Sequence, residues 1–329
     1  MTADDATRPP EVTRRREVRH TSARSLLMTV LGEFVLPVGR PVWTSALVDT
    51  LAGFGVAEKS ARQALARAAA EGLLVPERVG RRTRWDLTRS AHTLLTGGAQ
   101  RIYDFGRGER PWDGRWLLLL ISVPEAKRDL RHRLRTRLSW AGFGSPEAGV
   151  WISPHIGREG EALDVIKELG LDGCAMSFTA AFGAIGGEDA MVSRAWDLTG
   201  LEQRYEAFLA DFAALEPDGP AGILHAQTRL VHEWRRFPFL DPQLPRTLLP
   251  ANWSGAQAAE LFHRRHAEWQ PAASQRWDEL TLARRRLMLA HCRVNVGSAT
   301  VGANSAVRRR HAGPGPGRAG ARRRRQIGC

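Results

Sequence analysis

Residues 55–74 read GVAEKSARQALARAAAEGLL, and they predict a helix with two very different faces over residues 57–71. One face is small and apolar, with residues spaced three and four apart: Ala61, Ala64, Leu65 and Ala68. The opposite face is polar and largely cationic: Lys59, Arg62, Gln63 and Arg67. Alanines allow close packing while long polar side chains point outward, which is what a DNA recognition helix requires.

The neighbouring sequence supplies the other parts of a winged helix-turn-helix over residues 21–88. Residues 22–35 have apolar side chains at helical period, and Pro37, Gly39 and Pro41 are expected to stop that helix. A second helix is expected to begin at Thr44 or Ser45 as its cap, with the turn after it formed at Gly53 and Gly55. Residues 73–78 and 83–88 predict a hairpin whose basic tip contacts the DNA backbone or minor groove through Arg81, Arg82 and Arg84.

The remaining chain predicts an α+β multidomain protein. Residues 89–110 are expected to form a helical connector interrupted by Gly97 and Gly98. Residues 111–185 alternate strand and helix, with the run WLLLLISV at 116–123, which predicts a central ferredoxin-like α+β domain. Residues 186–289 predict a helical C-terminal domain. Residues 1–20 and the Arg-rich residues 290–329 are predicted to be a disordered arm and a disordered tail.

Composition restricts the classes of protein. The net charge of +13 favours a polyanionic partner, but nine arginines lie after residue 289, which leaves +4 for the rest of the chain. The three cysteines show no metal-ligand spacing and no disulfide framework. No run of 18 apolar residues and no signal-peptide pattern occurs, so we expect a cytoplasmic protein with no membrane partner.

Three parts of the chain have distinctive sequences. The first comprises SARSLLMTVLGEFVLP, the recognition-helix sequence and RVGRRTRWDLT; the second comprises WDGRWLLLLISVPE and GFGSPEAGVWISP. The third is EWRRFPFLDPQLPRTLLPANWSGAQAAELF. Together they resemble the PaaX family, repressors of phenylacetic-acid degradation genes and their relatives. The resemblance implies a winged helix, a central domain similar to the CRISPR adaptation nuclease fold, a helical C-terminal domain and a homodimer. It also implies double-stranded operator DNA as partner and an acyl-CoA thioester as effector.

The sequence favours a ligand-responsive repressor of a catabolic operon over two alternatives, a nuclease-like enzyme and a DNA-independent interaction protein. Ser122 and Val123 stand where the related nuclease fold has a metal-binding Asp, and no other carboxylate pair replaces it. Glu260, His263 and His266 are spaced three apart, which spreads them too widely for one metal ion. We therefore predict no catalytic residue, no metal site and no cofactor.

Two groups of residues are candidates for the effector site. The basic helix over residues 126–140 offers Arg128, Arg131 and Arg135 to ligand phosphates, with a solvated helix face as the alternative. The second group lies around a proline-rich stretch and is expected to take the acyl part, with C-terminal core as the alternative: Trp234, Arg235, Phe237 and Trp253.

Overall fold

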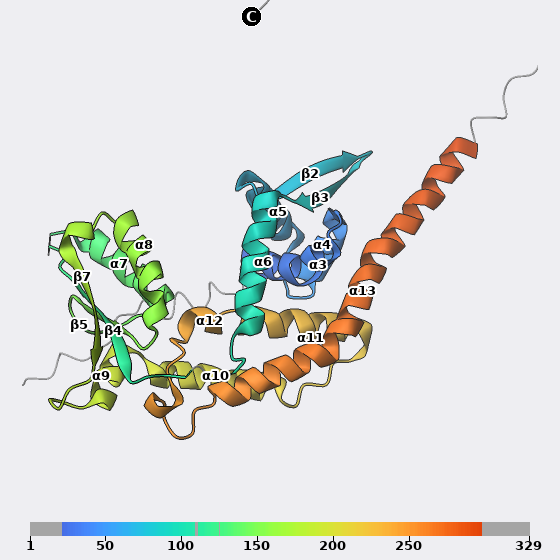
Figure 1. Ribbon diagram of the computed structural model, residues 1–329. Coiled ribbons are helices and arrows are strands. Elements are labelled where there is room, and N and C mark those ends of the chain that lie inside the picture. Colours follow the sequence, from blue (N-terminus) through green and yellow to red (C-terminus); the bar gives the residue numbers. More distant parts are fainter. Residues whose placement is uncertain (1–21, 109–110, 125, 298–329) are drawn as a thin grey trace, which may run out of the picture. The chain divides into compact units, whose positions relative to one another are not determined.

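The computed structural model describes residues 22–108, 111–124 and 126–297 (Figure 1). It is an α+β protein in which two small antiparallel sheets are accompanied by helices, as the sequence predicts. The arm predicted over residues 1–20 lies outside the described residues, as does the tail from residue 298 onward. Helix α13 (Gly255–Gly297) passes the boundary predicted at residue 289.

The N-terminal part combines helices with a three-stranded sheet of order β1-β3-β2. Its elements in chain order are α2 (Ala23–Val30), η1 (Leu31–Val35), α3 (Leu36–Val38), β1 (Val42–Trp43), α4 (Thr44–Ala52), α5 (Glu58–Ala70), β2 (Leu74–Val79) and β3 (Arg82–Leu87). Helices α2, α4 and α5 pack together on one apolar core that includes Leu27, Leu47 and Leu65, each at most 1% exposed.

The first helix ends at Gly39, one of the three residues expected to stop it, where φ is 59°. A π-helical turn and α3 continue the helical chain past residue 35, where the predicted helical pattern ends. The predicted cap of the second helix was wrong. Neither Thr44 nor Ser45 caps α4, since Trp43 occupies that position without a side-chain hydrogen bond. The Thr44 hydroxyl is used elsewhere: it donates to the Thr83 carbonyl at 2.9 Å and accepts from Trp85 Nε1 at 2.8 Å. It thereby ties α4 to the hairpin.

The connector is one uninterrupted helix, α6 (Arg89–Asp104), which corrects the break predicted at Gly97 and Gly98. Its N-cap, Thr88, accepts a hydrogen bond from the Ala91 amide at 3.1 Å. Buried Ala91 and Leu95 anchor the helix to the N-terminal core. A helical glycine costs about 1 kcal/mol relative to alanine, and packing offsets costs of that size.

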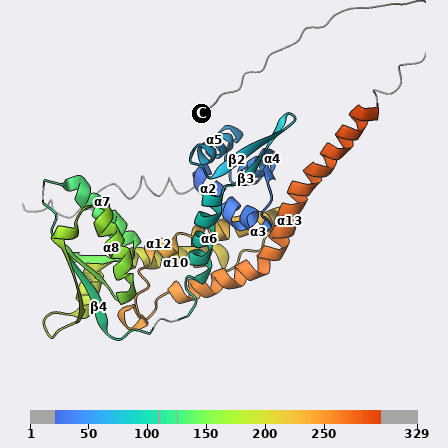
Figure 2. The same cartoon turned by 45° about the horizontal axis from the view of Figure 1, so that its top comes forward.

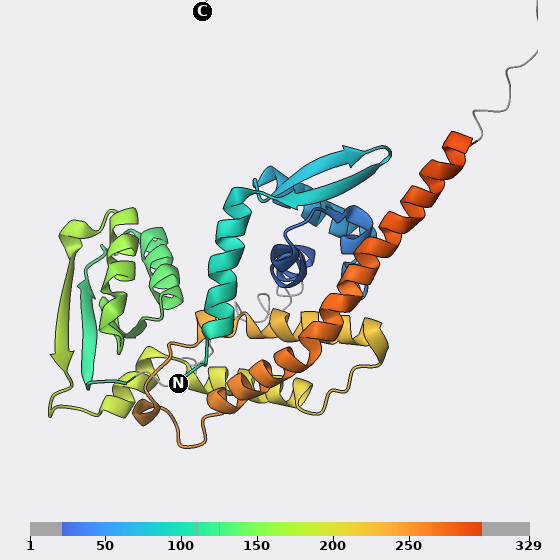
Figure 3. The ribbon, with the colours of Figure 1, turned by 45° about the vertical axis from the view of Figure 1, so that its right-hand side comes forward.

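The central part has a four-stranded antiparallel sheet of order β5-β6-β4-β7. Its elements are β4 (Arg115–Ile121), α7 (Arg128–Trp140), β5 (Gly144–Glu147), β6 (Val150–Ser153), η2 (Ile156–Arg158), α8 (Glu159–Glu168), η3 (Asp172–Cys174) and β7 (Ala175–Ala181). Helices α7 and α8 lie on one side of the sheet (Figure 3), where Leu119 and Leu138 share a buried core. The sequence did not predict β5, because its residues GSPE lack the alternating pattern of a strand.

The C-terminal part is helical, as expected. It contains α9 (Glu188–Ala195), α10 (Leu198–Phe212), α11 (Gly219–Trp234), α12 (Phe237–Leu240), η4 (Arg246–Leu248) and α13. Helices α10, α11 and the first turns of α13 lie side by side (Figures 1 and 2) around an aromatic core. Trp234 is at its centre with no exposed surface, stacked on Phe262 at 4.6 Å between ring centroids.

Candidate DNA-binding surface and ligand cavity

Helix α5 presents the cationic face that its sequence predicts. Ala61, Ala64 and Leu65 are at most 4% exposed, and they press the helix against α2 and α4. The four predicted contact residues are all exposed on the other side of the helix: Lys59, Arg62, Gln63 and Arg67. Close packing at alanines therefore fixes the backbone of α5 while leaving long polar side chains outside.

Arg62 differs from the other three residues because its side chain already pairs with a carboxylate of the same helix. Its Nε donates to Glu58 Oε1 at 2.8 Å, one helical turn earlier. Lys59, Gln63 and Arg67 make no side-chain hydrogen bond or ion pair with any other described residue. The pair of Arg62 and Glu58 is exposed, so it contributes little stability and a nucleic acid could displace the carboxylate.

Strands β2 and β3 form a hairpin with Gly80 and Arg81 at its tip. Gly80 has φ 61°, a left-handed conformation that favours glycine, in line with a tight two-residue turn. Arg81 and Arg82 are exposed, as is Arg78, which was not among the predicted contact residues. The hairpin thus carries a cationic tip suited to a phosphate backbone.

Arg84, in contrast, is held along the hairpin rather than at its tip. Its Nε and Nη2 donate to the two carboxylate oxygens of Glu77 at 2.7 and 2.6 Å. The Arg84 hydrogen bond lowers the pKa of the Glu77 carboxyl and, reciprocally, the carboxylate raises the pKa of Arg84. Of the three wing arginines predicted from sequence, only Arg81 and Arg82 are uncommitted among the described residues.

A buried carboxylate joins the N-terminal helices to the rest of the protein. Glu33 in η1 is 6% exposed and accepts hydrogen bonds from Gln227 Nε2 at 2.7 Å, from His266 Nε2 at 3.0 Å and from the Tyr103 hydroxyl. Burial opposes its ionisation, but these hydrogen bonds and the nearby His266 lower its pKa below the usual 4.5. Four elements, η1, α6, α11 and α13, therefore meet at one charge. Sequence reasoning missed this cluster, which we call the Glu33 hub.

The predicted effector residues do not form one site. Trp234 and Phe237 are 0% and 4% exposed in the C-terminal core, in line with the alternative interpretation for these two. Trp253 packs edge-on against Tyr205 at 5.7 Å. Arg235 donates to Thr29 Oγ1 at 3.0 Å in α2, and burial lowers its pKa. The basic residues are exposed on a different element, helix α7: Arg128, Arg131 and Arg135.

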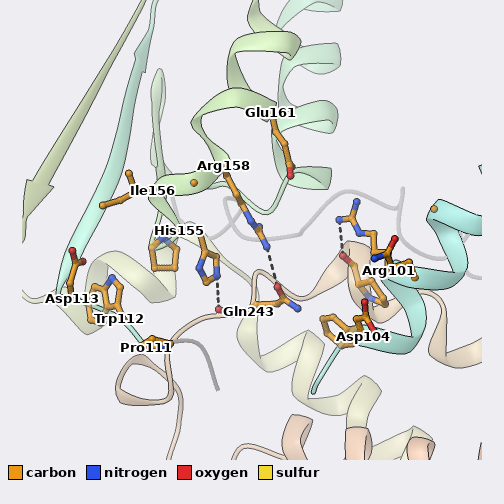
Figure 4. Close-up of a pocket in the computed structure, with 16 residues that line it drawn as sticks. Arg101, Asp104, Pro111, Trp112, Asp113, His155, Ile156, Arg158, Glu161 and Gln243 are labelled. Carbon is orange, nitrogen blue, oxygen red and sulfur yellow. Dashed lines mark hydrogen bonds between the residues drawn. The ribbon is translucent and has the colours of Figure 1, made fainter. Parts of the chain in front are cut away.

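A cavity lies between α6, the segment after β6 and the loop after α12. Its volume is about 1030 Å³, and Figure 4 shows its lining side chains. Gly97, Arg101 and Asp104 come from one face of α6. His155 and Arg158 face them from the segment after β6, with Gln243 between (Figure 4).

The hydrogen bonds of this cavity converge on Gln243. His155 Nε2 donates to the Gln243 carbonyl at 2.8 Å, and Arg158 Nη2 donates to Gln243 Oε1 at 3.3 Å. The Gln243 backbone N–H donates to Asp241 Oδ1 at 2.5 Å. Asp241 also accepts from the Tyr205 hydroxyl at 2.5 Å, and burial raises its pKa. The loop is thus held by the segment after β6 and, through Asp241, by Tyr205 of α10.

Three parts of the chain match models of known protein families. Residues 22–91 match the model of a PaaX-like protein, residues 109–192 that of the PaaX protein central Cas2-like domain, and residues 196–279 that of the PaaX-like protein C-terminal domain. The transcriptional repressor PaaX of Escherichia coli K12 is 32% identical over 264 residues, which cover 77% of this chain and 82% of that protein. The chain belongs to the PaaX family.

A solved structure supports the fold alone. Uncharacterized protein Rv0674 from Mycobacterium tuberculosis aligns with a TM-score of 0.52 and 24% identity, covering 79% of this chain and 99% of that one. Among the residues that the structure describes, no helix is long and apolar enough to cross a membrane.

The end of β4 is where the related nuclease fold carries its Asp. This PaaX-family chain has Ser122 there, and the Ser122 backbone amide donates to the Cys174 carbonyl at 2.9 Å.

Proposed function

We propose that this protein is a transcriptional repressor that binds operator DNA through helix α5 and the β2–β3 hairpin. The observation that carries the proposal is the exposed cationic face of α5 beside a hairpin with Arg81 and Arg82 exposed at its tip. The order of helices followed by a basic hairpin is that of a winged helix-turn-helix, whose recognition helix enters the major groove. The 32% identity to a transcriptional repressor supports the same function.

The finer parts of the proposal rest on topology and on the family. The central strands and helices follow the order β-α-β-β-α-β in an antiparallel sheet, which we interpret as a ferredoxin-like domain. We interpret this domain as a non-enzymatic coupling or dimerisation element, because Ser122 and Val123 offer no carboxylate ligand for a catalytic metal. We further propose a cytoplasmic homodimer, which the family suggests and whose two-fold symmetry would match a pseudo-palindromic operator.

The family also suggests what the repressor responds to. We propose that it controls a catabolic operon for aromatic acids or acyl-CoA compounds and leaves DNA when an acyl-CoA thioester binds. A ligand releases DNA only if it binds the DNA-incompetent state more tightly, so its site must influence the placement of α5. Trp234 and Phe237 are buried in the C-terminal core whereas Arg128, Arg131 and Arg135 are exposed on α7, and this difference favours a different site for the ligand.

The proposed DNA-binding function is tested by footprinting the DNA upstream of the neighbouring genes and measuring affinity by fluorescence anisotropy. The double variant Arg62→Ala, Arg67→Ala should lose operator preference. The control Arg194→Ala, Arg264→Ala removes two equally exposed arginines outside α5 and the hairpin, at 60% and 61% side-chain exposure, and should keep that preference. Equal operator affinity for both double variants and the wild type would refute the assignment of α5 as recognition helix.

A further inference from the structure

The cavity beside α6, of about 1030 Å³, is lined by no residue of α5 or of the β2–β3 hairpin. We propose that it is the regulatory ligand site, that its ligand is a large organic anion with an apolar part, and that α6 relays ligand binding to the Glu33 hub. This inference rests on the proposed ligand-responsive function, and its test measures ligand binding separately from DNA binding.

The size and lining of the cavity define the class of ligand. Ligand pockets typically span about 300–1,000 Å³, so this one is large enough that a single-ring acid would leave most of it empty. Apolar surface comes from five of the lining side chains: Phe105, Pro111, Trp112, Ile156 and Pro238. An extended molecule with an apolar part and several polar groups fits such a mixed lining.

Two guanidinium groups from opposite walls favour an anion. Arg101 is fixed by donating to the Pro238 carbonyl at 3.0 Å and by stacking 4.5 Å from the Phe239 ring centroid. Arg158 is fixed by donating to the Ala141 carbonyl at 2.8 Å. Guanidinium groups held in this way have further N–H donors with the planar geometry that phosphate and carboxylate groups accept.

The carboxylates of the cavity limit where that anion can lie. Asp113 is engaged by Arg115, whose Nε donates to it at 2.8 Å, and this hydrogen bond lowers the Asp113 pKa. Asp104 and Glu161 are exposed and also line the cavity. They repel a second negative group nearby and accept hydrogen bonds, which suits N–H or O–H groups on the middle of the ligand.

The loop at the cavity floor is strained. Gln243 has φ 59°, and it is the only non-glycine residue with positive φ among the described residues. Such a conformation costs on the order of 1–3 kcal/mol and persists only where surrounding contacts enforce it, often at ligand sites. Here His155, Arg158 and Asp241 enforce it. A ligand that takes over the Arg158 hydrogen bond would release this strain, which gives it a differential affinity for two loop states.

Helix α6 connects the cavity to the DNA-binding part. Gly97, Arg101 and Asp104 lie on its cavity face, whereas the Tyr103 hydroxyl donates to Glu33 in η1. The Ile102 carbonyl accepts from Trp234 Nε1 at 3.2 Å in the C-terminal core. A shift of α6 on ligand binding is therefore transmitted to η1 and to α2, the helix on which α5 packs.

Two adjacent glycines of α6 provide a matched test. Gly97 lines the cavity and Gly98 does not, and a Cβ at either position would meet nothing within 4 Å. Gly97→Trp should fill the cavity, whereas Gly98→Trp changes the same helix without filling it. The probes are phenylacetyl-CoA, free coenzyme A and phenylacetate, with Kd measured by calorimetry and operator release by anisotropy.

We expect phenylacetyl-CoA to bind the wild type most tightly and Gly97→Trp to weaken its binding at least about tenfold, or about 1.4 kcal/mol. Gly98→Trp should bind the thioester within about twofold of the wild type, and both variants should keep operator affinity. Tyr103→Phe should keep ligand affinity but release operator DNA less completely. A residue that only stabilises the fold would not separate these two readouts.

Three results would overturn the inference. The first is equal thioester binding by Gly97→Trp and the wild type. The second is loss of thioester binding in Arg131→Ala, Arg135→Ala but not in Gly97→Trp, which would assign the ligand to helix α7. The third is no binding of any probe by the wild type, which would also remove the ligand-responsive part of the proposed function while its operator binding, measured separately, still stands.

Discussion

Replacement of Glu33 by alanine should be among the most destabilising single changes in the N-terminal part. The carboxylate is 6% exposed and accepts three side-chain hydrogen bonds, from Tyr103, Gln227 and His266. A hydrogen bond to a charged group contributes about 1.5–3 kcal/mol, but bonds within one cluster are not additive. Removing one member of a buried charged cluster costs about 3–5 kcal/mol, so we expect a loss of that size in the free energy of unfolding.

Glu33→Gln should cost less, about 1–2 kcal/mol, because the amide keeps the volume and still accepts hydrogen bonds. The pKa of Glu33 is lowered in the folded protein, so its ionisation contributes stability above pH 4.5. That contribution should disappear as the pH falls from 4.5 through the lowered pKa. The Glu33→Gln protein has no carboxyl group to titrate at this position, so its free energy of unfolding should depend less on pH in this range.

Urea unfolding followed by tryptophan fluorescence measures both effects. Glu58→Ala is the matched control, because Glu58 is an N-terminal helix carboxylate with 63% side-chain exposure, and exposed ion pairs contribute at most about 1 kcal/mol. A Glu33→Ala protein as stable as Glu58→Ala would refute the view that the hub holds the N-terminal part in place.

Three further predictions concern DNA contact and packing. Arg67→Ala should lower discrimination between the operator and single-base variants by about 1–3 kcal/mol, measured by competition binding, and unchanged discrimination would remove Arg67 from the base-reading set. Arg82→Ala should weaken binding to all sequences and reduce the slope of log K against log salt by about 0.9. Arg84→Ala should change that slope less, because Glu77 holds the Arg84 guanidinium. A larger change of slope in Arg84→Ala than in Arg82→Ala would contradict the assigned roles. Trp277→Ala should lower the free energy of unfolding by about 3–5 kcal/mol, because Trp277 is 2% exposed and stacks on Phe34 at 5.4 Å between ring centroids. A loss below about 1 kcal/mol in urea unfolding would mean that the N-terminal core does not depend on this contact.

Local periodicity was enough to predict helix α5, the β2–β3 hairpin and most of the central elements. Ala61, Ala64 and Leu65 are buried because their spacing matches the helical period, and Gly80 marks the turn. The Glu33 hub had only a faint signal, a single carboxylate in the apolar run Leu31–Leu36. Its partners lie 70, 194 and 233 residues further along the chain, and no local pattern relates such distant positions.

Local sequence patterns could not predict the cavity beside α6 either, because its lining residues are distant in the sequence. The aromatic residues around the proline-rich stretch illustrate the same difficulty. Trp234 and Phe237 could be core or pocket by composition alone, and only tertiary packing distinguishes the two cases. The cavity draws its lining from α6, from the segment after β6 and from the loop at Gln243. Each contributes side chains that look like ordinary surface residues when the sequence is read locally.

The N-terminal part does not form its core alone, and this has a consequence for regulation. Its apolar cluster includes Leu224 of α11 together with Ala273 and Trp277 of α13, all at most 6% exposed. Helix α5 is therefore positioned by a core that the C-terminal helices complete, in addition to the charge at Glu33. Well-packed cores shift between discrete arrangements rather than deform gradually. A signal that moves α6 or α11 by a small amount can therefore change the position of α5 without touching the DNA-binding residues themselves.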